Sequence, residues 1–207
     1  MSTRVRLNDP DGWIAYLAPV KPARLVIFVH GFYGAADETW NFFPDGALTR
    51  PWWRQSDLLF VNYDSTRDEI GGVAYELRDR IPDFYPEILT DHPRLGAFRP
   101  DDFGDYEELY LVGHSLGGVI VRYALLECAI EWRNQLALNA HVPRPRLLDA
   151  RTFYFSPASA GFRPGGRLAL LKETRAWSLL ELQLRRSTAY TDLQQGSRLL
   201  ERLQDGT

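Results

Sequence analysis

A short apolar run passes directly into a long helical pattern through a glycine-containing junction, and this junction constrains the fold more than any other feature. Leu109-Tyr-Leu-Val112 has the character of a buried strand, and the residues from Gly117 onward have helical spacing. Between them stand Gly113, Ser115 and Gly117, in the pattern Gly-X-Ser-X-Gly. Small residues two places before and after the serine let the backbone turn sharply without clashes. The sequence therefore predicts a strand, a tight turn at Ser115 and a helix.

Apolar runs alternate with helical patterns along the rest of the chain. We expect strands at residues 12–17, 24–29, 57–63, 108–112 and 150–155, and helices at 68–89, 117–132, 165–173 and 191–204. The runs at 24–29 and 57–63 are continuous, which suits strands buried on both faces of a parallel sheet. Pro82 is expected to end or kink the first helix. Strands that alternate with helices predict a three-layer α/β/α sandwich with a mostly parallel sheet.

The composition is that of one compact domain. The 207 residues, 45% of them hydrophobic, suffice for a sizeable core, so we expect a single domain over residues 1–207. The net charge of -3 argues against nucleic acid as a partner. A single cysteine, Cys128, excludes an intrachain disulfide. The longest apolar run near the start, Leu25–Val29, is far shorter than a membrane helix needs. We therefore expect a cytoplasmic protein without a transmembrane segment.

A second junction, His30-Gly31-Phe32, follows the apolar run at 24–29. Gly31 permits a turn in which a backbone N–H faces the pocket beside Ser115. We predict that Ser115 is a nucleophile and that the backbone N–H groups of Phe32 and Leu116 form an oxyanion hole. The helix that begins after Ser115 adds the positive end of its dipole. His30 is interpreted as a structural residue that orients the loop.

These two junctions resemble the α/β-hydrolase superfamily. Val29-His-Gly-Phe-Tyr-Gly34 and Val112-Gly-His-Ser-Leu-Gly-Gly-Val-Ile-Val-Arg122 are similar to its serine esterase and lipase branch, which includes relatives of the GPI inositol-deacylase hydrolase domain. The resemblance runs from about Leu25 to Leu200. It implies an α/β-hydrolase fold and hydrolysis of small-molecule or lipid esters through an acyl-serine at Ser115, without a cofactor.

The superfamily's histidine and acid have no evident counterparts. The superfamily places Ser, Asp or Glu, and His in that chain order. Only His141 follows Ser115, and it precedes the next expected strand, at the wrong end to reach Ser115. Asp149 has the same placement, and Asp192 suits a solvated or helix-capping residue as well as an acid. Where the relatives carry a histidine after the next strand, this chain has Ala158.

Three explanations stay open. The chain is the N-terminal part of a longer protein, and its α/β-hydrolase fold then lacks a C-terminal part that is fused to it or associates with it. Alternatively, the base is His30, His92 or His141, or it comes from another chain. In the third case the chain is a non-catalytic α/β-hydrolase-like binding or signalling domain of a larger protein. The intact turn at Ser115 counts against the third, because strain there lowers stability without structural benefit.

Other patterns suggest no further chemistry. No Walker-type loop, dinucleotide turn or Cys/His cluster is present, so we expect no cofactor and no metal. Trp52-Trp53, with Phe42-Phe43 nearby, suits an acyl pocket or a lid and suits core packing equally well.

Overall fold

The structure, a computed structural model, describes residues 3–7, 12–40, 50–87, 104–139, 141–156 and 198–205. The strands are β1 (Thr3–Arg6), β2 (Ile14–Leu17), β3 (Arg24–Val29), β4 (Ser56–Val61), β5 (Glu108–His114) and β6 (Arg151–Phe155). The α-helices are α2 (Pro51–Arg54), α3 (Ile70–Arg80), α4 (Leu116–Leu138) and α8 (Arg198–Asp205), and the 3-10 turns are η1 (Glu38–Trp40), η2 (Ile81–Asp83) and η4 (Arg146–Asp149). Outside the described residues lie the helix expected at 165–173 and Phe42, Phe43, His92, Ala158 and Asp192.

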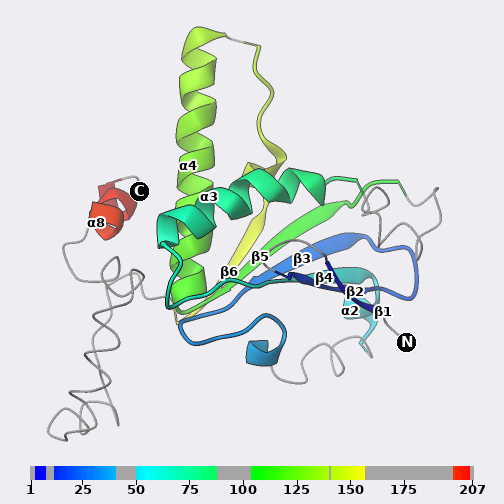
Figure 1. Cartoon of the computed structure of the whole chain (residues 1–207). Coiled ribbons are helices and arrows are strands. Elements are labelled where there is room, and N and C mark those ends of the chain that lie inside the picture. The colour runs from blue at the N-terminus through cyan, green and yellow to red at the C-terminus, as the bar shows by residue number, and fades with distance from the viewer. Residues whose placement is uncertain are drawn as a thin grey trace, which may run out of the picture.

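The described strands form one sheet in the order β1-β2-β4-β3-β5-β6 (Figure 1). β4, β3, β5 and β6 are parallel to one another, whereas β2 pairs antiparallel with both β1 and β4. The mostly parallel sheet confirms the expectation. The sequence does not predict strand β1, which forms by pairing with β2 across a short connection that favours the antiparallel direction.

The apolar runs of the sequence occupy the centre of the sheet. Every residue of β4 is buried, and all of β3 except Arg24 is buried. Asp57, at the start of β4, is fully buried and accepts hydrogen bonds from the Ala18 N–H and the Tyr106 hydroxyl, each 2.7 Å long. A carboxylate within a buried strand is tolerated because its oxygens have such partners.

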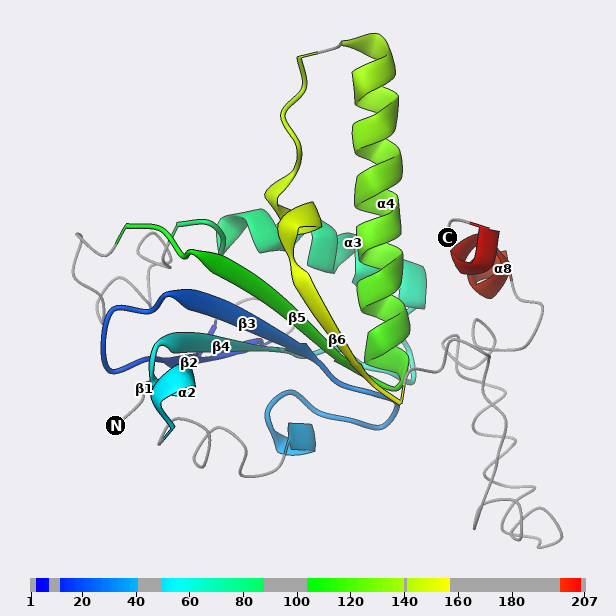
Figure 2. The same ribbon diagram turned by 180° about the vertical axis from the view of Figure 1, so that it is seen from behind.

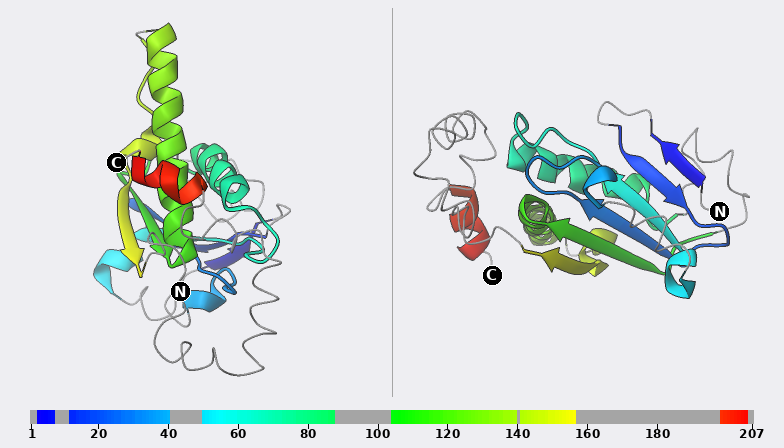
Figure 3. Two further views of the ribbon diagram at one scale, coloured as in Figure 1. Left: turned by 90° about the vertical axis from the view of Figure 1, so that its left-hand side faces the viewer. Right: turned by 90° about the horizontal axis from the view of Figure 1, so that it is seen from below.

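Helices cover both faces of this sheet. Figure 1 shows α3 and α4 lying together on one face, over the larger apolar core, with α4 reaching well beyond the sheet. Figure 2, seen from behind, shows α2 and η1 on the opposite side, over a smaller cluster centred on Phe28 and Phe60. Figure 3 shows α8 beside α4, where Arg202 pairs with Glu127 at 2.8 Å. The predicted α/β/α layering is therefore confirmed.

Two helix ends differ in how well the sequence predicts them. α3 ends at Arg80, and Pro82 lies in the 3-10 turn that follows, as expected, because proline lacks the N–H that a continuing helix needs. The end expected for α4 at residue 132 is wrong, since the helix continues to Leu138. Its last residues are mostly exposed but contain neither glycine nor proline, so local propensity favours helix without any core contact. Among the described helices, none combines the length and the apolar character that crossing a bilayer requires.

Candidate active site

Ser115 occupies the sharp turn between β5 and α4. Its backbone has φ 51° and ψ -114°, outside the conformations that most residues adopt. The Ser115 N–H donates to the Phe155 carbonyl at 2.9 Å, and the Ser115 carbonyl accepts the Gly118 N–H at 3.1 Å. The first bond ties the turn to β6, and the second ties it to the first turn of α4. Ser115 itself is half-buried within this packed scaffold.

The glycines around Ser115 are required by close backbone contacts. A Cβ at Gly113 would lie 2.6 Å from the Gly118 Cα, and a Cβ at Gly117 would overlap the Val29 carbonyl oxygen. Both approaches are far closer than any van der Waals contact. The Gly-X-Ser-X-Gly spacing therefore lets α4 begin directly against the ends of β5 and β3.

The loop after β3 passes directly beside Ser115. Val29 is registered with Gly113, so the residues that follow each strand emerge together at the same edge of the sheet. A Cβ at Gly31 would lie 3.0 Å from the Ser115 Cβ. Phe32, the next residue, is half-buried and packs against the larger core. The structure thus brings together the two segments that carry Ser115, Phe32 and Leu116. The oxyanion roles of the Phe32 and Leu116 N–H groups stay a prediction.

Side chains that follow β4 hold the same loop from its other side. The Tyr33 N–H donates to the Ser65 Oγ at 2.9 Å, and the Ala36 N–H donates to the Asn62 Oδ1 at 3.2 Å. Both acceptors follow the carboxyl end of β4. Sequence reasoning missed them, because single serine and asparagine residues after a strand carry no distinctive signal.

Strained backbone conformations cluster at the carboxyl ends of the parallel strands. Among the described residues, the non-glycine positions with positive φ are Tyr33 at 56°, Ser115 at 51° and Ser156 at 46°. They follow β3, β5 and β6, at the carboxyl ends of three neighbouring parallel strands. Strained residues of this kind cluster at functional sites, and ligands of α/β sheets bind outside the carboxyl strand ends. The backbone therefore locates a candidate active site independently of the motif.

His30 lies inside the scaffold of this site. Its ring is completely buried and stacks on Tyr63, with 4.2 Å between ring centroids. The Nδ1 atom lies 2.8 Å from the Gly31 carbonyl oxygen, so Nδ1 carries the proton, and the Tyr63 hydroxyl donates to the His30 carbonyl at 2.7 Å. Burial lowers the pKa of His30, which favours the neutral ring. These contacts agree with a role in orienting the loop, and burial disfavours the charged ring that would form if His30 took up the Ser115 proton.

His114, adjacent to Ser115, is directed toward the smaller apolar cluster. Its ring meets Trp40 of η1 edge to face, with 6.2 Å between ring centroids. Its Nδ1 atom also borders the loop after β3, because a Cβ at Gly31 would lie 3.0 Å from it.

His141 and Asp149 do not reach Ser115 of the same chain. His141 is exposed and follows the far end of α4, a helix of 23 residues that begins next to Ser115. At 1.5 Å per residue this helix spans roughly 34 Å. Asp149 pairs with Arg144 at 3.0 Å and precedes β6, so it lies at the amino ends of the parallel strands, whereas Ser115 lies at their carboxyl ends. The described residues thus place no acid–histidine pair at the site, and they hold no cluster of His, Cys, Asp and Glu that would bind a metal.

Comparison with known proteins supports the fold. No family model and no curated protein matches the sequence. The chain resembles the mature form of lipase BlEst2 from Bacillus licheniformis, with a TM-score of 0.52 and 19% identity over 97% of this chain and 66% of that one. It also resembles carboxyl esterase 2 of the mycorrhizal fungus Tuber melanosporum, with a TM-score of 0.53 and 13% identity over 100% of this chain and 59% of that one.

At these identities the likeness shows the fold, and this fold is that of the α/β hydrolases, as predicted. The chain spans less than two thirds of the length of either relative. The resemblance to the branch of the GPI inositol-deacylase hydrolase domain stays a prediction.

Proposed function

We propose that this chain carries the nucleophile of a serine hydrolase that cleaves esters through an acyl-serine intermediate at Ser115. The observation that carries this proposal is the backbone of Ser115, which is strained at φ 51° between β5 and α4 with Gly31 packed against it. A turn of this kind exposes a serine hydroxyl above the sheet, next to helix N–H groups. The fold shared with a lipase and a carboxyl esterase supports the same chemistry.

The proposed reaction begins with attack by the Ser115 Oγ on the carbonyl carbon of the ester. The carbonyl oxygen becomes an oxyanion, which the N–H groups of Phe32 and Leu116 stabilise. Loss of one such donor costs roughly 3 kcal/mol of transition-state stabilisation. The intermediate then expels the alcohol, which takes up the proton that Ser115 lost. Water attacks the acyl-serine in the second half of the reaction and releases the carboxylic acid.

The base that carries this proton is proposed to lie outside the described residues. A histidine oriented by an acid is the usual group for this step. It would come from ranges that the structure does not describe, from a further domain fused to or associated with this chain, or from a second copy. We propose a small-molecule or lipid ester as the substrate and the serine esterase and lipase branch as the nearest family.

A second candidate function is a non-catalytic binding or signalling domain. It is favoured by the lack of an acid–histidine pair at Ser115 among the described residues. The two functions differ in whether Ser115 reacts.

Hydrolysis of a short-chain p-nitrophenyl ester by the protein of the complete reading frame tests the proposal. Ser115→Ala should abolish turnover. Arg144→Ala is the control, because Arg144 is exposed and pairs with Asp149 at the end of the sheet opposite to Ser115, and it should retain activity. No turnover by the folded wild-type protein, or equal turnover by Ser115→Ala, would refute the proposal and favour the binding domain.

A further inference from the structure

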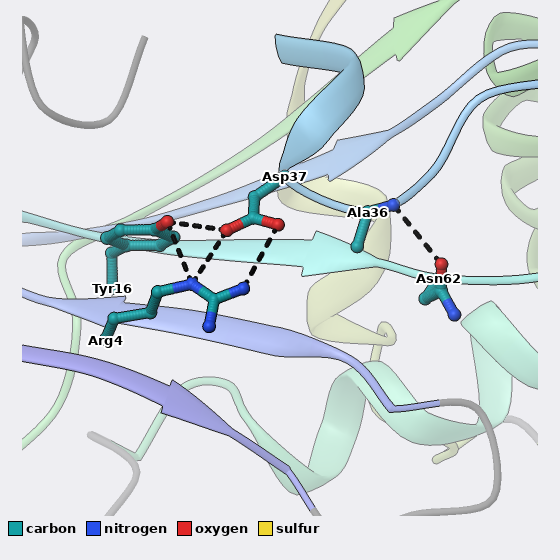
Figure 4. A network of polar contacts seen from close by, with 5 residues as sticks. All are labelled: Arg4, Tyr16, Ala36, Asp37 and Asn62. Atoms are coloured by element: carbon teal, nitrogen blue, oxygen red, sulfur yellow. Dashed lines mark hydrogen bonds and ion pairs between the residues drawn. The ribbon is translucent and has the colours of Figure 1, made fainter. Parts of the chain in front are cut away.

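A polar cluster ties the loop after β3 to β1 and β2, the two outermost strands on one side of the sheet (Figure 4). The Arg4 guanidinium on β1 donates to Asp37 through Nε at 2.9 Å and through Nη2 at 3.3 Å. The Tyr16 hydroxyl on β2 donates to the same carboxylate at 2.5 Å and accepts a bond from Arg4 Nε at 3.1 Å. Asp37 directly precedes η1 and belongs to the loop that begins at Gly31.

The loop is fixed at both of its ends and, between them, by the bonds of the Tyr33 and Ala36 N–H groups to Ser65 and Asn62. At one end, Gly31 packs against Ser115, and a methyl group on Gly31 would lie only 3.0 Å from the Ser115 Cβ. At the other end, Asp37 meets Arg4 and Tyr16 on the first two strands. Strands β2, β4 and β3 lie between β1 and the serine-bearing β5. At about 4.8 Å per strand, the cluster connects the site to groups well over 10 Å away across the sheet.

The charges in the cluster are complementary at neutral pH. Burial alone would raise the pKa of Asp37, but the hydrogen bonds from Arg4 and Tyr16 outweigh it and lower that pKa below its usual value. Burial and the bond to Asp37 raise the pKa of Tyr16 to about 12. Asp37 is thus ionised and Tyr16 protonated, so all three groups keep the protonation states that the bonds need.

The cluster contributes little to the sheet and its larger core. Arg4 and Tyr16 are registered partners whose backbones already pair β1 with β2. Their neighbours Val5 and Ala15 face the larger core on the opposite side. Tyr16 retains its edge-to-face contact with Phe60 without its hydroxyl. Loss of the polar contacts therefore leaves the fold in place and removes chiefly the hold on the loop at Asp37, while the bonds to Ser65 and Asn62 remain.

We propose that Arg4, Tyr16 and Asp37 are positioning residues that hold the loop from Gly31 to Asp37 so that the Phe32 N–H is directed at the oxyanion formed at Ser115. This inference rests on the proposed function. Oxyanion donors act on charge that develops only in the transition state. Weakening their placement therefore lowers kcat and leaves KM nearly constant. A misplacement of about 1 Å can reduce a rate by roughly 100-fold.

The test compares Asp37→Ala, Arg4→Ala and Tyr16→Phe in the protein of the complete reading frame. We expect kcat for a p-nitrophenyl ester to fall at least tenfold in Asp37→Ala and Arg4→Ala and less in Tyr16→Phe, with KM changed by less than twofold. Added guanidinium ion should restore part of the activity of Arg4→Ala and none of that of Asp37→Ala. The matched control is Arg144→Ala. Its side chain is as exposed as that of Arg4, 53% against 51%, and its pair with Asp149 lies far from Ser115.

A second measurement does not depend on activity. In the Ser115→Ala background, hydrogen exchange at residues 33–37 should accelerate when Asp37→Ala is added and stay unchanged when Arg144→Ala is added. Unaltered exchange in Asp37→Ala would overturn the inference even if the protein proved inactive. Unaltered kcat of Asp37→Ala in an active enzyme would overturn it while the proposed function stood. A rise in KM at constant kcat would also overturn it.

Discussion

A methyl group at Gly117 is expected to separate α4 from the sheet and to destabilise the fold. The Cβ of Gly117→Ala would overlap the Val29 carbonyl oxygen and lie 2.5 Å from the His30 carbonyl oxygen, both backbone atoms that cannot rotate away. Overpacking of this kind costs about 1–3 kcal/mol, and the better helix propensity of alanine offsets at most about 1 kcal/mol. Two rigid backbone contacts place the cost near the upper end of this range, so after the helix-propensity offset the net loss is about 2 kcal/mol.

Urea denaturation followed by circular dichroism measures this loss. Gly72→Ala is the matched control, because Gly72 lies in α3 and has no atom within 4 Å of its Cβ position. That variant should be unchanged or more stable by about 0.5–1 kcal/mol. Gly117→Ala with wild-type stability and wild-type reactivity at Ser115 would refute the argument that Gly117 sets the approach of α4 to β3.

Three further predictions concern stability. Tyr63→Phe removes the bond to the buried His30 carbonyl and should lower the free energy of unfolding by about 1–3 kcal/mol, and an unchanged urea midpoint would contradict this. Arg202→Ala removes the ion pair of the buried Glu127 and should expose α8 to limited proteolysis, whereas an unchanged cleavage rate would refute a holding role for that pair. The pKa of Tyr16, about 12 in the fold and about 10 in the unfolded chain, means that the unfolded state loses this proton first. The stability that this pKa difference provides is present below pH 10 and is lost toward pH 12. The free energy of unfolding of Tyr16→Phe should therefore fall less with pH over that range than that of the wild-type protein. An identical pH profile for the two proteins would contradict the shift.

The turn at Ser115 could be predicted because its causes are local. Gly113 and Gly117 are spaced so that two backbone contacts can close around one serine, and an apolar strand and a helical pattern flank them. The buried strands were equally accessible, since a parallel sheet covered on both faces needs continuous apolar runs. Sequence reasoning therefore found the central strands and the serine that follows one of them.

The contacts that hold the neighbouring loop were not predictable in the same way. Arg4 and Asp37 are 33 residues apart, and neither belongs to a motif. Strand β1 has one buried residue in the middle of its pattern, so its pairing with β2 is what defines it. The C-terminal end of α4 lies in mostly exposed residues, where no core contact marks a boundary. Positions set by distant partners leave no periodic signal in a single sequence.

Mass spectrometry of a fluorophosphonate adduct tests the central claim most directly. The folded protein is treated with the probe, its intact mass is measured, and the modified peptide is sequenced. An activated Ser115 predicts one adduct per chain, located at Ser115 and lost in Ser115→Ala. An adduct on another residue, or a folded protein of the complete reading frame that stays unmodified, would contradict the claim that the turn between β5 and α4 presents a catalytic nucleophile.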